Sequence, residues 1–255
     1  MEKIPVSVAV ICKNEEHNIG RLLESVRDFA EIVIVDSGSV DKTLQIASQY
    51  TDRIYSHDWM GDGPQRQIAI GYCQNNWILN LDADEVVTEA LKQEIIEAIK
   101  DPHFHGYQLK FNDFFMGDFH SNWTKMNAKV RMFRRDSVVF PEKIVHASAP
   151  DVTGRVRVLK NPVLHYGDMA IETRLKKDNL YSDLIVQQKI QANKKASFLK
   201  LIFVFPLVFI KSYFLRRYFL DGRRGFVGSM INAFYAFLKE AKLYEYEQNQ
   251  KKRSH

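Results

Sequence analysis

The chain has 255 residues, of which 45% are hydrophobic and 26% are charged, as in a folded globular protein with room for a core and an appendage. Its two cysteines, Cys12 and Cys73, exclude a disulfide framework and a metal-thiolate site, so we expect a reducing compartment. The net charge of +5 is uneven, because residues 1–173 carry 19 Lys and Arg against 25 Asp and Glu, whereas residues 174–255 carry 17 against 6. The basic part is therefore expected to meet an anionic surface, either nucleic acid or membrane.

Strand-like and helix-like patterns alternate four times in the first hundred residues. Apolar strands are predicted over residues 4–12, 31–35, 53–55 and 77–81. Helices are predicted over residues 15–29, after residue 39, over residues 63–72 and up to residue 100, with Asn14 and Thr88 as N-caps of the first and the last. We interpret the N-terminal apolar run as the first strand and not as a signal peptide, because acidic residues follow it at once. The alternation predicts a mostly parallel sheet with helices on both faces.

Three acidic segments follow predicted strands: KNEE at 13–16, DSGSVDKT at 36–43 and DADE at 82–85. In parallel sheets, ligands bind outside the carboxyl ends of the strands, so we expect these segments on one edge. None of them is the glycine-rich phosphate loop of a dehydrogenase or a P-loop NTPase. This edge is therefore expected to bind phosphate in another way.

The carboxylates of Asp82, Asp84 and Glu85 crowd the end of a buried strand, where they repel one another. A divalent cation, Mg²⁺ or Mn²⁺, would remove that repulsion and would also bind diphosphate oxygens. An isolated Asp-x-Asp is often only a solvated loop or a helix start. The position at a strand end, beside a second acidic turn, favours the metal site.

The basic C-terminal part contains ten apolar residues, 201–210, between Lys200 and Lys211. Spanning a bilayer takes about 20 apolar residues, so this run is too short by itself. It continues as SYFLRRYFLDGRRGFVG, which mixes aromatic residues with four arginines and is typical of an interfacial helix over anionic headgroups. A helix packed on the catalytic domain is the alternative. No nucleic-acid-binding motif accompanies the basic residues, so we expect no nucleic acid but a peripheral position on the cytoplasmic face of the cell membrane.

The segments SVAVICKNEEHNIGRLLESV, IVIVDSGSVDKT and PQRQIAIGYCQNNWILNLDADE resemble the nucleotide-sugar half of a family 2 glycosyltransferase with a GT-A fold. The likeness is greatest to bacterial lipopolysaccharide inner-core β-1,4-glucosyltransferases that act on heptose, and it extends to FRRDSVVF, VLHYGD, KKDNLYSDL and FLDGRRGFVGS. The resemblance implies an α/β GT-A catalytic domain over 1–170, with a nucleotide-sugar half, 1–100, and an acceptor half, 101–170. Residues 171–255 would form a helical, membrane-associating extension.

The resemblance also implies roles for five residues on the acidic edge. Glu16 and Asp36 would hold the nucleotide, Asp36 at uracil, and Arg66 would also reach the nucleotide. Asp82 would bind ribose or metal-bound water, and Asp84 would ligate the metal that bridges the diphosphate. A first-turn charge favoured by the helix dipole is the alternative for Glu16, and a solvated helix position is the alternative for Arg66. For Asp41 and Thr43, a structural role at a helix start is the preferred interpretation.

The general base is the point where the sequence departs from the family. A Val-His-Glu stretch usually supplies it, but residues 144–147 read Ile-Val-His-Ala, and Ala147 cannot accept a proton. Glu142 and His146 are the candidates, since the pKa of a histidine suits the task. Asp113 and Asp118, which flank a glycine-containing turn, are further carboxylates. His165 in LHYGD is a candidate partner of the metal or the diphosphate, with a structural role as its alternative.

The motifs predict a metal-dependent enzyme, and the resemblance implies that it is an inverting transferase that moves a hexose, glucose, from a UDP-sugar to a lipid-linked saccharide, the lipopolysaccharide core. A sugar nucleotidyltransferase is a second hypothesis, although it needs a glycine-rich basic loop that KNEEHN does not provide. A third is a membrane-peripheral sugar-nucleotide-binding protein without activity, suggested by Ala147. The released product separates them: UDP for transfer, pyrophosphate for activation and neither for mere binding.

Overall fold

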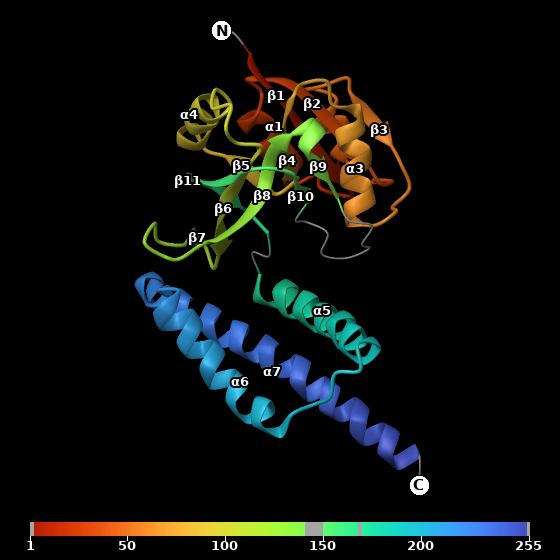
Figure 1. Ribbon diagram of the computed structural model, residues 1–255, viewed down its shortest axis with the longest axis vertical. Coiled ribbons are helices and arrows are strands. Elements are labelled where there is room, and N and C mark those ends of the chain that lie inside the picture. The colour runs from red at the N-terminus through yellow and green to blue at the C-terminus, as the bar shows by residue number, and fades with distance from the viewer. Residues whose placement is uncertain (1–2, 141–149, 168–169, 254–255) are drawn as a thin grey trace. The chain divides into compact units, whose positions relative to one another are not determined.

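The computed structural model describes residues 3–140, 150–167 and 170–253 (Figure 1). The chain forms two compact units. The first, the sheet unit, comprises Met1–Asp113 and Asn127–Gly167, and the second, the helical unit, comprises Phe114–Met126 and Asp168–His255. The division at residue 170 stays a prediction, and in the structure the segment 114–126 clusters with the helices.

The sheet unit is built on parallel strands β1 (Ile4–Cys12), β2 (Phe29–Asp36), β3 (Ile54–Ser56) and β4 (Trp77–Asp82). The sheet continues through β8 (Asn127–Arg134), β6 (Gly106–Phe115), β11 (Val156–His165) and β5 (Glu85–Val87), in the order β3-β2-β1-β4-β8-β6-β11-β5. Strand β8 runs antiparallel to β4 and β6, and β5 antiparallel to β11. The short strand β7 (Asp118–Phe119) pairs with β6, whereas β9 (Val138–Val139) and β10 (Asp151–Val152) form a separate two-stranded sheet after the 3₁₀ turn η1 (Arg135–Ser137). The expected mostly parallel sheet is confirmed for its N-terminal half.

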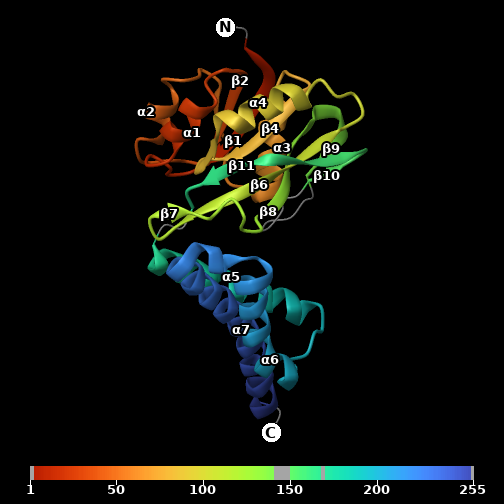
Figure 2. The ribbon, with the colours of Figure 1, turned by 90° about the vertical axis from the view of Figure 1, so that its left-hand side faces the viewer.

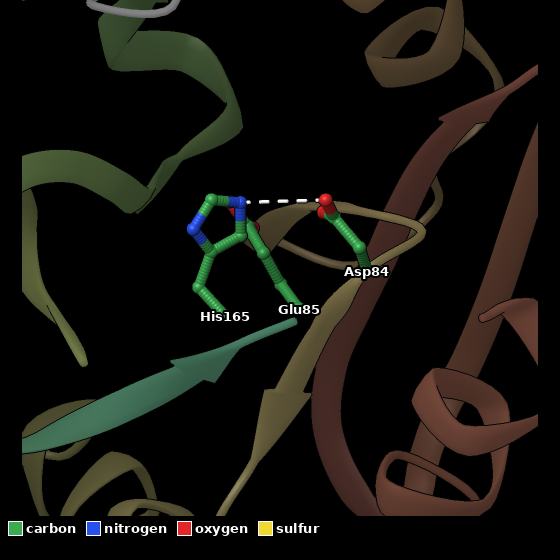
Figure 3. Close-up of side chains that lie close together, drawn as sticks. All are labelled: Asp84, Glu85 and His165. Atoms are coloured by element: carbon green, nitrogen blue, oxygen red, sulfur yellow. Dashed lines mark ion pairs between the residues drawn. The ribbon is translucent and has the colours of Figure 1, made fainter. Parts of the chain in front are cut away.

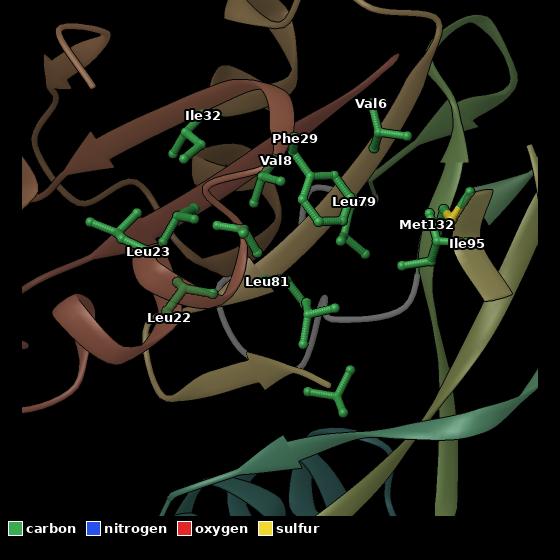
Figure 4. Packing of buried hydrophobic residues seen from close by; sticks show 14 of the residues in the cluster. Val6, Val8, Leu22, Leu23, Phe29, Ile32, Leu79, Leu81, Ile95 and Met132 are labelled. Atoms are coloured by element: carbon green, nitrogen blue, oxygen red, sulfur yellow. The ribbon is translucent and has the colours of Figure 1, made fainter. Parts of the chain in front are cut away.

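Helices cover both faces of this sheet, as predicted. Helices α1 (Ile19–Ser25), α2 (Thr43–Ala47) and α4 (Glu89–Ala98) pack with Val8 and its same-face neighbours (Figure 4). Helix α3 (Asp62–Tyr72) packs with Ala9, which points to the opposite face. The reason is the alternation of side chains along a strand, which gives β1 and β2 one apolar row on each side.

The first helix is shorter than predicted, because Asn14 does not cap it. The backbone of Asn14 has a φ of 55°, and its side-chain oxygen accepts a hydrogen bond from the N–H of Val40 at 2.9 Å. Its own N–H donates to Ser39 at 2.8 Å. Asn14 therefore ties two loops together and α1 begins only at Ile19. The predicted cap of α4 is confirmed, since Thr88 Oγ1 accepts from the N–H of Leu91 at 3.1 Å.

The helical unit contains α5 (Ile171–Gln191), α6 (Phe198–Ile210), the π-helical turn η2 (Lys211–Leu215), the 3₁₀ turn η3 (Tyr218–Asp221) and α7 (Gly222–Arg253). Helices α6 and α7 lie side by side, and α5 packs on α7 (Figures 1 and 2). Because η2 prolongs α6, the apolar helical segment extends to Leu215 and is long and apolar enough to cross a membrane by length and composition alone. The expectation that the apolar run is too short to span a bilayer is therefore wrong, because it counted only residues 201–210 and left out the helical residues that follow Lys211.

Candidate active site

The three acidic segments lie at one edge of the sheet. Strand pairing sets Cys12 beside Asp36 in β2 and Ile11 beside Asp82 in β4, so KNEE, DSGSVDKT and DADE leave the same ends of parallel strands. The predicted gathering of these segments is thereby confirmed. It follows from the parallel register of β2, β1 and β4.

KNEE and DSGSVDKT are joined by hydrogen bonds from backbone N–H groups to side-chain oxygens. Glu15 N donates to Thr43 Oγ1 at 2.7 Å, and Glu16 N donates to Asp41 at 3.1 Å. The carboxylate of Glu16 accepts from the N–H of Lys42 at 3.1 Å. Asp41 and Thr43 therefore have the structural role preferred from the sequence. Glu16 belongs to this loop junction, and its contact with a nucleotide stays a prediction.

Asp36 shapes the loop that follows β2. One of its oxygens accepts hydrogen bonds from the N–H groups of Gly38 and Ser39, both at 2.9 Å, and the other accepts from the Ser39 hydroxyl. The residue is only 1% exposed. The structure thus places Asp36 at the predicted edge, where it fixes the loop 37–39, while its contact with uracil stays a prediction.

Asp82 lies between two arginines. Its two carboxylate oxygens each accept from a guanidinium, Arg66 at 2.6 Å and Arg131 at 2.6 Å. Burial would raise the pKa of Asp82, but the positive charges of Arg131 and Arg66 hold that pKa well below its usual range. Asp82 is therefore an anion, and Arg66 is not the solvated helix residue of the alternative interpretation.

Arg66 and Arg131 are both buried, and each guanidinium donates to several polar side chains, although the Nε of Arg131 has no hydrogen-bond partner among the described residues. Arg66 also donates to Asn80 at 2.6 Å and to Asp62 at 2.9 Å. Arg131, 1% exposed, also donates to Glu85 at 2.9 Å. Burial raises the pKa of Glu85, and the charge of Arg131 opposes the rise. Arg131 was missed in the sequence; its only signal there is a charge inside the apolar strand sequence VRMF.

Asp84, Glu85 and His165 converge on one point (Figure 3). Their ligand atoms all lie within 4.8 Å of one another, and the Nε2 of His165 is 3.4 Å from an Oδ of Asp84. The topology brings them together, because β11 pairs with β5 so that His165 faces Glu85. Glu85 already accepts a hydrogen bond from Arg131. The side chains of this group that are available to bind a metal ion are therefore Asp84 and His165. The predicted proximity of His165 to the acidic motif is thus observed, whereas its role stays a prediction.

His165 is held from its other side by Asp113, whose carboxylate lies 2.8 Å from the Nδ1 of the ring. Burial would lower the pKa of His165, but the hydrogen bonds with Asp113 and Asp84 raise it to about 10. The ring is therefore an imidazolium in the metal-free protein. A carboxylate on the far nitrogen is the arrangement that orients a metal-ligating histidine, so the donor set fits a divalent cation such as Mn²⁺, which accepts both carboxylate and imidazole.

This charge arrangement corrects one step of the sequence argument, in which only a metal made the three carboxylates tolerable. Arg66, Arg131 and His165 already balance Asp82, Asp84 and Glu85. The compensating groups come from α3, β8 and β11, which are distant in sequence. The fold therefore does not require a cation at Asp84 to offset these carboxylates.

The structure does not describe the two residues that are the candidates for the general base. Glu142 and His146, together with Ala147, lie outside the described residues. Asp113 is engaged with His165, and Asp118 pairs with Arg224 at 3.1 Å in the helical unit. The identity of the base stays a prediction.

Such a sheet edge, with paired carboxylates and a histidine but no glycine-rich loop, fits the class of sugar-nucleotide-dependent transferases. Residues 7–161 match the family described as glycosyl transferase family 2, and the chain belongs to this family. It is 32% identical over 256 residues to the lipopolysaccharide core biosynthesis glycosyltransferase LpsC of Rhizobium meliloti, covering 95% of this chain and 93% of that protein. It is 34% identical over 265 residues to an uncharacterized glycosyltransferase of Rickettsia felis, covering 96% of this chain and 90% of that protein.

The fold is shared with a solved structure. The crystal structure of Staphylococcus aureus TarS 1–349 in complex with UDP aligns with a TM-score of 0.51 at 17% identity, covering 98% of this chain and 92% of that one. With the family match, this confirms the expected GT-A fold with a C-terminal helical extension.

Proposed function

We propose that the chain is an inverting, metal-dependent glycosyltransferase that moves a hexose, glucose, from UDP to a sugar of the lipopolysaccharide core. The convergence of Asp84 and His165 beside the edge formed by β1, β2 and β4 carries the proposal. The similarity to LpsC, a protein of lipopolysaccharide core biosynthesis, supports the acceptor class.

Asp84 and His165 would hold Mg²⁺ or Mn²⁺, and the bound ion would neutralise charge on the departing diphosphate. Asp113 fixes the ring of His165 so that Nε2 points to Asp84. Arg66 and Arg131 clamp both oxygens of Asp82, which fixes the strand end that carries Asp84. The chain thereby supplies a pre-organised site in which few groups move when the donor binds.

The nucleotide would lie along the loops that follow β1 and β2. Glu16, Asp36 and Arg66 are the groups we assign to it, Asp36 through the loop that it shapes and Arg66 through its position beside Asp82. Asp82 would contact ribose or a metal-bound water. An acceptor hydroxyl would attack the anomeric carbon opposite UDP, and Glu142 or His146 would take its proton.

The basic helical unit would hold the enzyme at the cytoplasmic face of the cell membrane, where a lipid-linked acceptor is reached. Exposed apolar residues on α6 and cations near both its ends support this peripheral position.

The test is UDP release from a panel of UDP-sugars with a core oligosaccharide acceptor, in the presence and absence of Mn²⁺. Asp84→Asn should lower turnover about 100-fold or more while the thermal unfolding midpoint changes little, because Asp84 is at the partly exposed edge. Glu89→Gln, an exposed carboxylate in the first turn of α4, is the control and should retain full turnover. Undiminished turnover in Asp84→Asn would refute the role of this residue. Release of pyrophosphate instead of UDP would identify a nucleotidyltransferase, and binding of UDP-sugar without any release would identify an inactive binding protein.

A further inference from the structure

An apolar stripe runs along the outer side of α6 and η2. Its members are spaced by three or four residues and are therefore on one helical face, and each is between 48% and 66% exposed: Leu199, Phe203, Leu207, Ile210 and Phe214. The opposite face of α6 packs on α7, where the rings of Phe209 and Phe226 are 5.6 Å apart. Large aliphatic and aromatic side chains that are exposed in such a row mark an interaction surface.

Positive charges accompany the stripe at both ends. Lys200 directly follows Leu199, Lys211 directly follows Ile210, and both are exposed. Lys194 and Lys195 precede α6 and line a pocket of about 470 Å³ with Lys251 and with one carboxylate, that of Glu247. No acidic residue occurs between residues 184 and 220, so α6, η2 and the segment before α6 carry only positive charges of their own. Apolar side chains flanked by lysines complement anionic lipid headgroups over acyl chains, whereas a protein partner would have to bring acidic residues to both ends.

The length of α6 and η2 does not determine whether this segment would span a membrane or lie in its plane. The segment Phe198–Leu215 has 18 residues, which corresponds to about 27 Å of helix and is close to the thickness of a bilayer core. The packing of the helices within the helical unit does determine this orientation. Helix α7 separates α6 from α5, and α5 is rich in charge.

The polar contacts of α5 with α7 lie beside the middle and one end of α6. Arg174 donates to Asn232 of α7 at 2.7 Å, and Lys189 pairs with Glu240 at 2.6 Å. Asn232 is six residues beyond Phe226, so it lies along the central part of the antiparallel α6. If α6 crossed the bilayer with its packing intact, these groups would enter the hydrocarbon, which is costly. An α6 lying flat keeps them on the water side.

From this arrangement we propose that α6 and η2 bind in the plane of one leaflet of an anionic phospholipid membrane, with the stripe in the acyl region and Lys200 and Lys211 at the headgroups. The inference refines the membrane association proposed above and is independent of the sugar that is transferred. The one partner proposed for this surface is a membrane leaflet that contains anionic lipid.

Vesicle co-sedimentation of the full chain tests the surface. We expect Phe203→Gln/Leu207→Gln to weaken binding to vesicles of phosphatidylcholine and phosphatidylglycerol at least about tenfold. Lys200→Gln/Lys211→Gln should weaken it by about tenfold, and the loss should disappear on phosphatidylcholine alone. The control Val158→Gln/Leu180→Gln, two exposed apolar residues outside α6, should bind as the wild type does. Unchanged binding of the stripe variant overturns the proposal, as does a wild-type dimer that the stripe variant dissociates in sedimentation velocity.

Depth measurements test the flat orientation. Cys12 and Cys73 are buried, so fluorescent labels can be directed to Leu199→Cys, Leu207→Cys and Phe214→Cys. Quenchers at known depths in the bilayer should place all three labels at the same shallow depth. A label at residue 207 that lies much deeper than the other two would show a spanning helix and would overturn the proposal.

Donor chemistry is measured separately on the same stripe variant, as Mn²⁺-dependent UDP release in detergent with a soluble core oligosaccharide. Retained UDP release with lost vesicle binding supports the surface. Absent UDP release in the wild type concerns only the proposed function, since vesicle binding does not need it.

Discussion

His165 lies between two carboxylates, with Nε2 3.4 Å from Asp84 and Nδ1 2.8 Å from Asp113. Asp84 lies in the turn between β4 and β5, His165 in β11 and Asp113 in β6, and the register of the sheet aligns His165 with Asp113. In the proposed metal site, Asp84 and His165 would be the ligands, and Asp113 would orient the ring.

Asp113 is expected to act through His165. Asp113→Asn should weaken Mn²⁺ binding by about 10- to 100-fold, because the ring loses the carboxylate that orients it and raises its basicity. Titration calorimetry with Mn²⁺ in the presence of UDP measures this change. The control is Asp118→Asn, which removes an exposed carboxylate in contact with Arg224. Equal Mn²⁺ affinity in Asp113→Asn and the wild type would contradict the positioning role.

Arg131 is expected to stabilise the sheet unit, because it is the cation shared by Asp82 and Glu85. Arg131→Met leaves buried carboxylates without that partner and should lower the free energy of unfolding by about 3–5 kcal/mol. Lys129→Met on the same strand removes an exposed cation and should change it by less than about 0.5 kcal/mol. Denaturant titration compares the two. Similar losses in both variants would show that Arg131 is not a special support of the site.

Asp221 is expected to hold the segment 114–126 to the helices of its own unit. Its buried carboxylate accepts from Ser121 N at 2.6 Å and Thr124 Oγ1 at 3.2 Å, and it lies 2.7 Å from the Nδ1 of His120. Asp221→Ala leaves these groups unsatisfied and should lower the free energy of unfolding by about 1–3 kcal/mol.

Limited proteolysis gives a second measure of Asp221→Ala, since the released segment should be cleaved faster. Asp183→Ala, which removes the exposed partner of Lys242, provides the comparison. Proteolysis at the wild-type rate in Asp221→Ala would show that the segment is held by other contacts.

The two thiols should be unreactive in the folded protein. Burial raises the pKa of Cys73 to about 12 and raises that of Cys12 still further, with the charge of Asp36 adding to the effect on Cys12. Because a thiol with a raised pKa stays protonated, a disulfide reagent should not modify either cysteine at pH 9 until denaturant is added.

The same shifts bear on stability. The unfolded thiols ionise near pH 8.5, whereas the folded ones stay protonated, so this contribution to the free energy of unfolding is fully present below pH 8.5 and declines as pH rises toward about 12. Cys73→Ala should reduce that decline. Rapid modification of the native protein at pH 9 would contradict the burial of the thiols.

The sheet was largely predictable from sequence, since β1 matches its predicted range and β4 extends it by one residue. Both strands are mostly apolar, interrupted only by Ser7 in β1 and by Asn80 and the terminal Asp82 in β4, which is typical of strands buried on two faces. The helix ends were less predictable, because Asn14 binds the neighbouring loop instead of capping α1. Such long-range hydrogen bonds have no signal in local sequence.

The site was predictable in its motifs and not in its pairings. DADE and the histidine of LHYGD were each recognisable, but their proximity depends on β11 pairing with β5, eighty residues away. Arg131 belongs to no recognisable sequence motif, and its contact with the carboxylates of DADE depends on the pairing of β8 with β4. The resemblance to family 2 glycosyltransferases supplied roles that spacing alone could not.

The most direct measurement of the central claim is an anomalous difference map from crystals of the protein grown with Mn²⁺ and UDP. We expect one strong manganese peak in bonding contact with Asp84 and with Nε2 of His165, with the diphosphate of UDP on its open side. A peak elsewhere, or UDP bound with Asp84 and His165 still paired to each other, would contradict the proposed metal site.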